Sequence, residues 1–279
     1  MQLEHKDVLN ILPERKADSH KGDYGKILLL CGSVGYTGAA ALAAMGALRS
    51  GAGLVYVGVP ESIYSIEAVK LTEAIVFPLP EEDGKLSAKA IPAIRKHLAG
   101  MDAVLIGPGL GQSAGTRAVL GAVLREFEGP VVVDADGISL VAACPERIKK
   151  RKDPTILTPH EGEFRRLNIA LEEERLAGTM IAARELGCII LRKGHETVIT
   201  DGTDYYINPT GNPGMAVGGS GDVLSGILVS LLGQGIDPLR ASACAAYLHG
   251  AAGDRCAEKM GQYGMLPTDM VQELPYLMK

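Results

Sequence analysis

The sequence predicts an α/β protein: a three-layer α/β/α sandwich with a mostly parallel sheet, formed by one domain that spans residues 1–279. Short apolar runs recur along the chain, and stretches with helical spacing of apolar residues separate them. Strands joined in this way pair in parallel through right-handed crossovers, which place helices on both faces of a sheet. No Pro/Gly/Ser-rich linker and no internal repeat divides the chain, so we expect a single domain.

The expected elements follow in order along the chain. Strands are predicted at residues 26–32, 54–60, 103–109, 130–136, 155–160 and 188–194. Intervening helices are predicted at residues 37–50, 88–98, 116–127 and 172–186. After Gly194 the pattern changes to two short β-like runs joined by Asp201 and Gly202, which is a strong hairpin signal. The remaining chain is expected to be helical at residues 223–232, at 239–259 and after Pro267.

Composition and charge exclude several classes of partner. Hydrophobic residues make up 47% of the chain and charged residues 22%, which is ordinary for a globular protein. The net charge is -5 with both signs interspersed, so there is neither a basic stripe for nucleic acid nor a polybasic anchor for lipid. The N-terminal segment lacks the apolar core of a signal peptide, and no apolar run is long enough to span a bilayer. We therefore expect a cytoplasmic protein with buried free thiols and no nucleic-acid or membrane partner.

Glycine is the one clear deviation in composition, with 35 of 279 residues. The glycines gather in loops that follow the expected strands: GSVGYTGAA, IGPGLG, TPHEGE and RKGHET. The carboxyl ends of parallel strands lie at one edge of a sheet, and ligands bind outside that edge. We therefore expect these loops to form one binding site.

The segment NPGMAVGGSGDVLSGIL, residues 212–228, places several glycines directly before a lone acid, Asp222. If a helix begins at Val223, the amide groups of residues 219–222 lie unpaired at the positive end of its dipole and form an anion hole. Glycine lets a phosphate close on such a backbone. Asp222 is then either a helix cap or a general base that deprotonates a hydroxyl as it attacks a phosphoryl group. The glycines and the hairpin entry favour the general base.

This pattern is neither a P-loop nor a dinucleotide fingerprint, because the spacing of both differs. A GGSGD run late in an α/β chain, entered from a hairpin, resembles the ribokinase-like superfamily of small-molecule kinases. Within it, GNPGMAVGGSGDVLSG, HKGDYGKILLLCGSVGYTGAAALAA, IGPGLG, VVDADG, LTPHEGEFRRL and LRKGHETVI resemble the ADP- or ATP-dependent NAD(P)H-hydrate dehydratases. The chain departs from the typical family form at Val217 and Ser220, where Thr is usual; Ser220 keeps a hydroxyl and Val217 lacks one.

The resemblance implies a metabolite-repair enzyme. Such an enzyme dehydrates the S epimer of NADHX or NADPHX, the hydrated forms of NADH and NADPH, while ADP is converted to AMP and phosphate; ATP and Mg²⁺ are further implied ligands. ADP is favoured over ATP because a form without a fused epimerase domain is similar to bacterial members. A separate epimerase would then convert the R hydrate into the S form. Relatives form tetramers, so a homo-oligomer is expected.

The same resemblance assigns the site residues. Asp222 is the implied catalytic residue and also contacts the substrate, together with Ala40, Gly109 and His160. The implied nucleotide-binding residues are Lys193, Gly194, His195, Glu196, Thr197, Gly218, Gly219, Ser220 and Gly221.

Acids elsewhere on the same rim are candidates for metal or for turn formation. Glu163 is a candidate for organising Mg²⁺, because related sugar kinases use an Asn-x-x-Glu motif; here His160 stands at the Asn position, and an ordinary first-turn acid is the alternative. Asp134 and Asp136 follow an expected strand and could hold magnesium through water or cap the next turn.

Two other functions share these features. A ribokinase-like kinase for a vitamin-precursor alcohol would use the same Gly-rich loop and Asp222, but is not expected to combine GNPGM with KGHET and TPHEGE. A non-catalytic nucleotide sensor on the same fold would have no need for Asp222.

Overall fold

The computed structural model describes residues 1–169 and 174–279. These residues form a nine-stranded sheet in the order β11-β10-β9-β8-β7-β6-β1-β2-β3 and a separate two-stranded one, β4-β5. The strands are β1 (Lys26–Leu30), β2 (Leu54–Pro60), β3 (Ile75–Leu79), β4 (Glu81–Glu82), β5 (Lys85–Leu86), β6 (Ala103–Ile106), β7 (Val131–Val133), β8 (Thr155–Leu157), β9 (Ile189–Arg192), β10 (Val198–Thr200) and β11 (Tyr205–Ile207). From β9 to β3 all pairs in the large sheet are parallel, whereas β10 is antiparallel to both of its neighbours.

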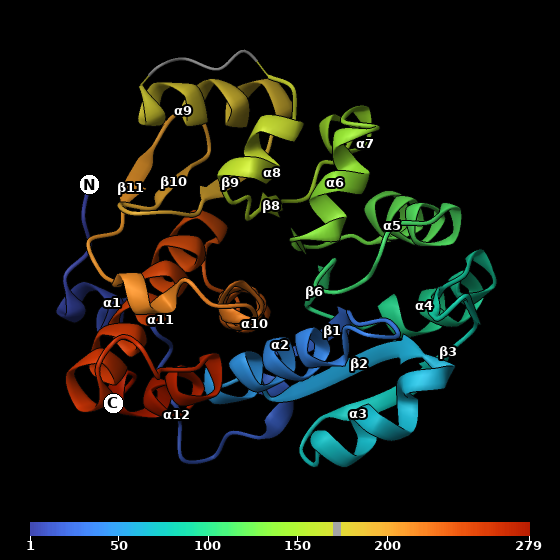
Figure 1. Ribbon diagram of the computed structural model, residues 1–279, viewed down its shortest axis with the longest axis horizontal. Helices are drawn as coiled ribbons and strands as arrows, with labels where there is room; N and C mark the ends of the chain where they lie inside the picture. The colour runs from blue at the N-terminus through green and yellow to red at the C-terminus, as the bar shows by residue number, and fades with distance from the viewer. Residues whose placement is uncertain (170–173) are drawn as a thin grey trace.

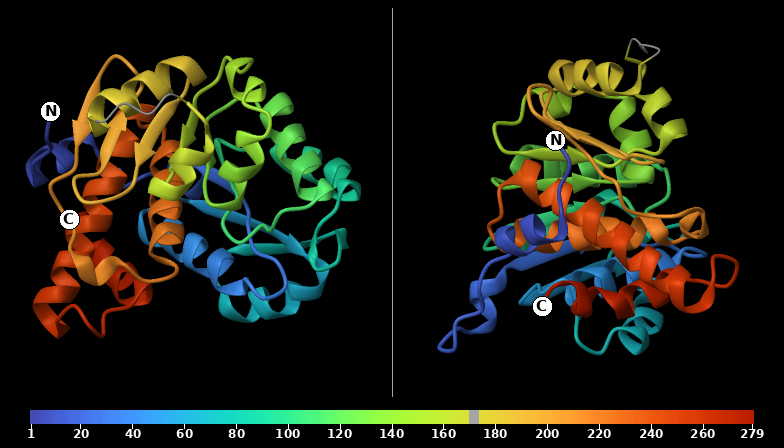
Figure 2. Two further views of the ribbon diagram at one scale, coloured as in Figure 1. Left: turned by 45° about the horizontal axis from the view of Figure 1, so that its top comes forward. Right: turned by 90° about the vertical axis from the view of Figure 1, so that its left-hand side faces the viewer.

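Helices cover both faces of the large sheet (Figures 1 and 2). One layer contains α1 (His5–Ile11), α2 (Thr37–Arg49), α3 (Tyr64–Lys70), α10 (Ser220–Gly233), α11 (Pro238–Met260) and α12 (Pro267–Leu277). The other contains α4 (Ile91–Leu98), α5 (Ala114–Glu126), α6 (Asp136–Ala142), α7 (Glu146–Lys149), α8 (Glu161–Arg166) and α9 (Arg175–Leu186). Short 3-10 turns occur at η1 (Lys21–Tyr24), η2 (Glu61–Ile63), η3 (Ala88–Ala90) and η4 (Pro213–Met215).

Strand β1 shows why this chain forms three layers. Successive side chains of a strand point to opposite faces, so Ile27 and Leu29 enter the core under α2 and α10, while Leu28 and Leu30 enter the core under α4 and α5. All four are 0% exposed. A continuous apolar run is what a central parallel strand needs when helices cover both of its faces. The predicted α/β/α sandwich is confirmed.

Several elements differ from the sequence-based expectation. Strand β3 was not predicted, because IVFPL contains Pro78 and lies half-exposed at the sheet edge, where a missing N–H is tolerated. The short helices α1, α3, α6, α7 and α8 span only about one or two turns, which leaves little periodicity to read. The first residues of the helix expected at 172–186 lie outside the described residues, and α9 begins at Arg175.

The strand order reverses between β1 and β6, which places the site. After β1 the chain runs outward through β2 and β3, then returns through α4 to β6 on the other side of β1. Ligands in open α/β sheets bind at such a reversal, outside the carboxyl ends of the strands. The loops after β1 and β6 are tied together there, since Gly32 N donates to Pro108 O (2.8 Å) and Ser33 Oγ to Gly109 O (2.7 Å). Among the helices that the structure describes, none is long and apolar enough to cross a bilayer.

Candidate active site

The Gly-rich segment leads directly into α10, which begins at Ser220, three residues earlier than expected. Gly219 is its N-cap, with φ 96°, a left-handed conformation that favours glycine. Asp222 therefore lies within the first turn and is not the N-cap, so the capping alternative for this residue is wrong. Its carboxylate is free for another role.

The start of α10 offers backbone donors as expected, with one exception. Ser220 N donates to Val217 O (3.3 Å), so this amide is already used. The amides of Gly219, Gly221 and Asp222 donate to no protein acceptor within the described residues. Because these groups lie at the positive end of a 14-residue helix, they form a place for an anion.

The Asp222 carboxyl has a strongly perturbed acidity. Burial and the neighbouring carboxylates of Asp134 and Glu163 raise its pKa to about 7, against a smaller opposing effect of Lys193. A general base is most effective when its pKa lies near the operating pH. At neutral pH the Asp222 carboxyl is thus poised to accept a proton.

Lys193 links the end of β9 to the end of β7 and to α10. Its Nζ lies 2.9 Å from Asp134 Oδ1, and Asp134 Oδ2 accepts a hydrogen bond from Ser225 Oγ at 2.5 Å. Burial alone would raise the pKa of Asp134, but Lys193 together with the hydroxyls of Ser225 and Thr158 lowers it overall. Asp134 and Glu163 in turn raise the pKa of Lys193 against the effect of its own burial. A Cβ at Gly221 would stand 3.3 Å from Lys193 Nζ, so this ammonium lies directly beside the anion hole.

His160 and Glu163 cap the start of α8 together. His160 Nδ1 accepts from the amides of Gly162 (3.0 Å) and Glu163 (3.3 Å), and Glu163 Oε2 accepts from His160 N (2.8 Å). The same Oε2 is 3.8 Å from Lys193 Nζ. The His160 side chain is 56% exposed, so it reaches the rim, whereas that of Glu163 is 8% exposed. Both residues thus hold a helix start and face the site from β8.

The KGHET turn follows β9 and joins the same rim. Thr197 Oγ1 donates to Gly194 O (2.9 Å) and closes the turn, while Gly194, His195 and Glu196 are exposed. Arg175 of α9 holds the start of this turn, since its guanidinium donates to the carbonyls of Arg192 (2.9 Å) and Lys193 (2.8 Å). The structure therefore brings the two predicted nucleotide stretches together through Lys193.

The two remaining predicted substrate contacts meet at the reversal point, but only one reaches its surface. Gly109 has φ 60°, and a Cβ there would stand 2.8 Å from Ala39 Cβ, so the loop after β6 touches α2. Ala40 is 0% exposed and packs under Gly32, because it faces the core side of α2. Its neighbour Gly38 is exposed, and Ala39 is half-buried against Gly109.

The paired acids after β7 have separate roles. Asp134 forms the ion pair with Lys193, as described above. Asp136 instead holds the loop after β6, because its Oδ2 accepts from Gly111 N (2.9 Å). Of the two, only Asp134 belongs to the charged cluster at α10.

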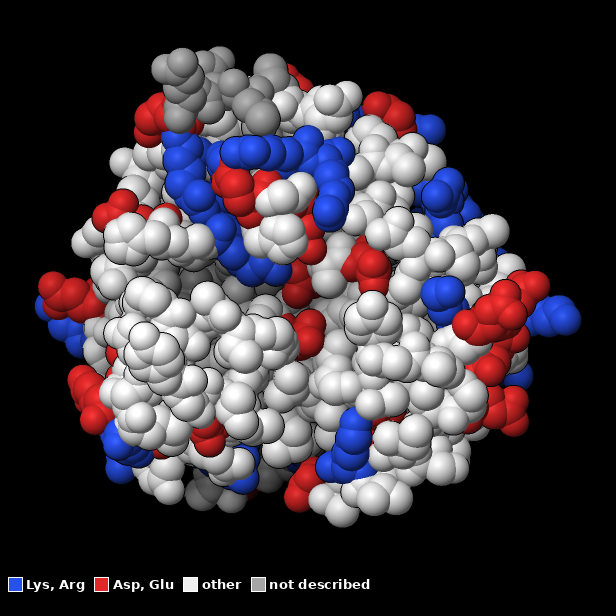
Figure 3. Space-filling model, in the orientation of Figure 1, with Lys and Arg blue, Asp and Glu red and all other residues white. Residues whose placement is uncertain are grey.

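Figure 3 views this face of the molecule. Asp and Glu side chains lie in the hollow at its centre, and Lys and Arg side chains gather beside it over α8 and α9. The cluster contains the carboxyl groups of Asp134, Glu163 and Asp222 but only the ammonium of Lys193. This excess of carboxylate fits a divalent cation that arrives with a phosphate ligand, since Mg²⁺ is usually held by one or two carboxylates plus substrate phosphates.

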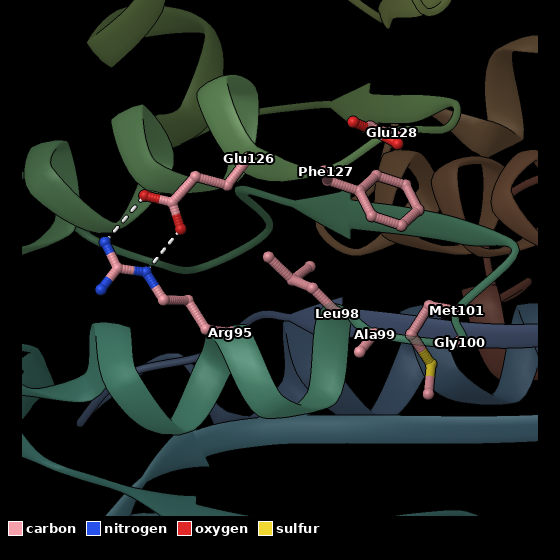
Figure 4. Close-up of a pocket in the computed structure, with 8 residues that line it drawn as sticks. All are labelled: Arg95, Leu98, Ala99, Gly100, Met101, Glu126, Phe127 and Glu128. Carbon is pink, nitrogen blue, oxygen red and sulfur yellow. Dashed lines mark hydrogen bonds and ion pairs between the residues drawn. The ribbon is translucent and has the colours of Figure 1, made fainter.

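A cavity of about 360 Å³ at the opposite edge of the sheet is a different feature (Figure 4). The cavity lies between α4 and α5, next to residues that precede β6 and β7. Among the described residues that line it, Phe127 is the one buried aromatic side chain. Arg95 and Glu126 point toward each other and form two hydrogen bonds, which lower the pKa of Glu126 to about 2. Glu126 is held in the ion pair with Arg95, and the cavity lies at the amino ends of the strands. We therefore do not assign catalysis to this cavity.

The model of the NAD(P)H-hydrate dehydratase family matches residues 27–276. The chain belongs to the NAD(P)H-hydrate dehydratase family. The predicted family resemblance is confirmed.

Individual members of this family match over nearly the whole chain. A bifunctional NAD(P)H-hydrate repair enzyme of Moorella thermoacetica is 45% identical over 96% of the chain and 52% of its own length. The chain thus spans about half the length of this relative. An ADP-dependent (S)-NAD(P)H-hydrate dehydratase of Bacillus subtilis is 36% identical over 96% of the chain and 94% of its own length.

Solved structures confirm the ribokinase-like fold of this dehydratase-family chain. A ribokinase-like superfamily protein of Enterococcus faecalis has a TM-score of 0.87 and 30% identity, and covers 99% of this chain and 94% of its own. An ADP/ATP-dependent NAD(P)H-hydrate dehydratase of Bacillus subtilis, co-crystallised with ATP and Mg²⁺, has a TM-score of 0.83 and 34% identity over 98% of this chain and 96% of its own.

Sequence reasoning missed two side chains in this dehydratase-family site. Ser225 follows Asp222 at i+3, a spacing that puts both on one side of α10, so the sequence did contain a signal for it. His249 of α11 is 9% exposed and lies 3.2 Å, by its Nε2, from Ser220 Oγ. The sequence signal for His249 is a single histidine within an Ala-rich helix, which by itself is weak evidence of a functional residue.

Proposed function

We propose that this chain catalyses the nucleotide-dependent dehydration of the S epimer of NADHX and NADPHX, which returns NADH and NADPH. The observation that carries the proposal is Asp222: a carboxyl with a pKa of about 7 on the first turn of α10, beside amides that have no protein acceptor. A base beside an anion hole suits phosphoryl transfer to a hydroxyl. Membership in the NAD(P)H-hydrate dehydratase family supports the hydroxyl of the hydrated nicotinamide ring as the attacking group.

The chemistry divides into two steps. Asp222 removes the proton of the ring hydroxyl, and the hydroxyl oxygen attacks the terminal phosphorus of the nucleotide. The bond between this phosphorus and the bridging oxygen breaks, and, when the nucleotide is ADP, AMP is the leaving group. The lone pair of the ring nitrogen then expels the phosphate, and loss of a proton from the neighbouring ring carbon restores the double bond. The sum is hydrate plus ADP giving reduced cofactor, AMP and phosphate.

The nucleotide is proposed to lie between α10 and the KGHET turn. The amides of Gly219 and Gly221, with the neighbouring Gly218, suit its terminal phosphate, and Lys193 stands beside them as a counter-charge. Of the residues of the turn, Gly194, His195 and Glu196 are exposed and Thr197 is half-buried, and we propose that they contact the nucleotide. We propose that Mg²⁺ accompanies the nucleotide, neutralises phosphate charge when bound, and is organised by Glu163, with Asp134 as the second carboxylate within reach of Lys193.

The substrate is proposed to occupy the crevice at the strand-order reversal. Gly109 packs closely against Ala39 and Tyr36 at the start of α2, so the ring is proposed to lie over this contact, with the exposed imidazole of His160 on the same rim of the sheet. Because Ala40 is buried, we propose that its effect on the substrate is indirect: it sets the position of Gly32, of the exposed Gly38 and of the half-buried Ala39.

Further parts of the proposal concern partners. The relative in Moorella thermoacetica is called bifunctional, and this chain matches about half of it, so we propose that an epimerase acting outside these 279 residues supplies the S epimer. ADP is proposed as the preferred nucleotide because the Bacillus subtilis relative of similar length is called ADP-dependent. A homotetramer and a cytoplasmic location stay predictions; light scattering of the purified protein tests the first.

One assay tests the central proposal. The protein is incubated with purified S epimer of NADHX, Mg²⁺ and either ADP or ATP, and the return of reduced-nicotinamide absorbance is followed. We expect equal amounts of NADH, AMP and phosphate with ADP, no turnover of the R epimer, and no turnover after Mg²⁺ is chelated. A kinase for another alcohol would instead leave the hydrate unchanged. Absence of NADH with both nucleotides would overturn the proposal.

A further inference from the structure

A buried side-chain pair connects the anion hole to the helix behind it. Ser220, the first residue of α10, places its Oγ 3.2 Å from His249 Nε2 of α11. The two residues are 7% and 9% exposed. The catalytic chemistry proposed above uses the backbone around Ser220 but gives His249 no part.

Helix α11 holds His249 and the Gly-rich segment in one rigid unit. A Cβ at Gly250 would come 2.2 Å from Thr210 Oγ1, and one at Gly253 would come 2.4 Å from Met215 Sδ, so the loop lies directly on the helix. Asp254 fastens it further, because its carboxylate accepts from Gly211 N and Asn212 Nδ2, both at 2.9 Å. The loop that leads into α10 is therefore fastened to α11 within a few residues of His249.

The protonation state of His249 limits what it can do. Burial, with a smaller effect of nearby Lys193, lowers its pKa to about 4, against an opposing effect of the Ser220 backbone. At neutral pH the imidazole is uncharged, with one N–H donor and one acceptor nitrogen. If Nε2 accepted, the Ser220 proton would point at the histidine and the Oγ lone pairs would face an incoming phosphate. If Nε2–H donates, the Ser220 hydroxyl is free to donate in its turn.

We propose that His249 is a positioning residue: its Nε2–H donates to Ser220 Oγ and so directs the Ser220 O–H toward the transferring phosphate. The inference rests on the proposed nucleotide-dependent function. It adds a side-chain donor to a hole where the Ser220 amide is already used by Val217 O. A hydroxyl that donates to a charged acceptor forms one of the stronger hydrogen bonds. A neutral imidazole orients it without bringing another charge beside Lys193.

The test compares variants that differ only in whether they reach Ser220. His249→Gln carries an amide N–H to about the place of Nε2, whereas His249→Asn is too short; both keep the buried position polar. We measure the binding of ADP and AMP to the full chain by titration calorimetry, and kcat and KM for the hydrate reaction. AMP lacks the transferring phosphate. His249→Asn and Ser220→Ala are expected to weaken ADP binding about tenfold and to lower kcat, with AMP binding unchanged.

The conservative variant and the double variant decide whether the two residues act as a pair. His249→Gln is expected to bind ADP nearly as wild type does. The variant with both Ser220→Ala and His249→Asn is expected to be no weaker than either single variant, since each change removes the same hydrogen bond. Losses that add, or an unchanged ADP affinity in His249→Asn, would overturn the inference.

Two further readouts separate a positioning role from other roles. Ser242→Ala removes another buried hydroxyl of α11, one that bonds to Pro238 O at 2.7 Å, and is expected to change neither ADP nor AMP binding. The apparent pKa of the acid limb of the pH–rate profile is expected to be the same in the His249 variants as in wild type. A shift of this pKa would assign proton transfer to His249 and overturn the positioning role. If wild-type protein binds ADP but returns no NADH, the proposed function fails while the binding experiment still decides this inference.

Discussion

Lys193 and Asp134 form a buried ion pair across the carboxyl edge of the sheet, with 2.9 Å between Nζ and Oδ1. Asp134 accepts a further hydrogen bond from Ser225 Oγ, whereas Asp222 accepts no hydrogen bond and forms no ion pair in the described part of the chain. Two acids that both feel the charge of the Lys193 ammonium thus have opposite pKa shifts, lowered for Asp134 and raised for Asp222. Such divergence separates a structural acid from one that exchanges protons.

The first prediction concerns the pH dependence of the wild-type enzyme. Since Asp222 must be ionised to act as a base, kcat/KM is expected to fall about tenfold per pH unit below a pKa of about 7. Asp222→Asn is expected to lose activity by about a hundredfold or more at every pH. Rates measured from pH 5 to 9 check both statements. An acid limb near pH 4 would show that the pKa of the Asp222 carboxyl is not raised in the working enzyme.

The second prediction uses the ion pair to move that limb. Asp134→Asn removes a negative charge that raises the pKa of Asp222 and also frees Lys193, which lowers it. The acid limb is therefore expected to shift to lower pH, with a loss of about 3 kcal/mol in stability because Lys193 loses its buried partner. Asp136→Asn is the matched control: Asp136 bonds to the loop amide of Gly111 and does not act on Asp222, so the limb should stay in place.

Much of the fold was legible from the sequence, because the signals are local. Continuous apolar runs such as β1 and the turn signal at Asp201 and Gly202 each lie within a few residues. The pair of Lys193 and Asp134 was not predictable in this way. The two residues are 59 positions apart, and only the order β9-β8-β7 brings their strand ends to one place. Local pattern supplied the members of the site, and strand order decides which of them touch.

The limits of local pattern are clearest at Ala40 and at the start of α10. An Ala-rich helix gives a weak amphipathic signal, so the sequence did not show that Ala40 faces the core while Ala39 is half-buried against Gly109. Glycines before a helix leave its first residue undefined, and the extra turn from Ser220 changed Asp222 from a candidate cap to a first-turn residue.

The third prediction is that the Asp222 carboxylate destabilises the fold. The folded protein holds its proton up to about pH 7, whereas the unfolded chain releases it near the ordinary aspartate pKa of 3.8. Folding therefore takes up a proton between these values, so stability rises as pH falls through this window and is lowest above it. At pH 8, Asp222→Asn is expected to be more stable than wild type by on the order of 2 kcal/mol, and at pH 4 to have no advantage. Urea unfolding at both pH values measures the difference, and equal gains at the two would contradict it.

The fourth prediction separates a glycine needed by a ligand from one needed by the fold. Nothing lies within 4 Å of the place where a Cβ at Gly218 would stand, and its φ is not in the left-handed region, so Gly218→Ala meets no obstacle in the protein. Its free energy of unfolding is expected to change by less than about 0.5 kcal/mol. A phosphate closing on this backbone would meet the new methyl group, so ADP affinity is expected to fall about tenfold or more. Gly264→Ala, at an equally open glycine outside the loop, should change neither quantity. If Gly218→Ala bound ADP as wild type does, the phosphate would not approach the backbone at Gly218.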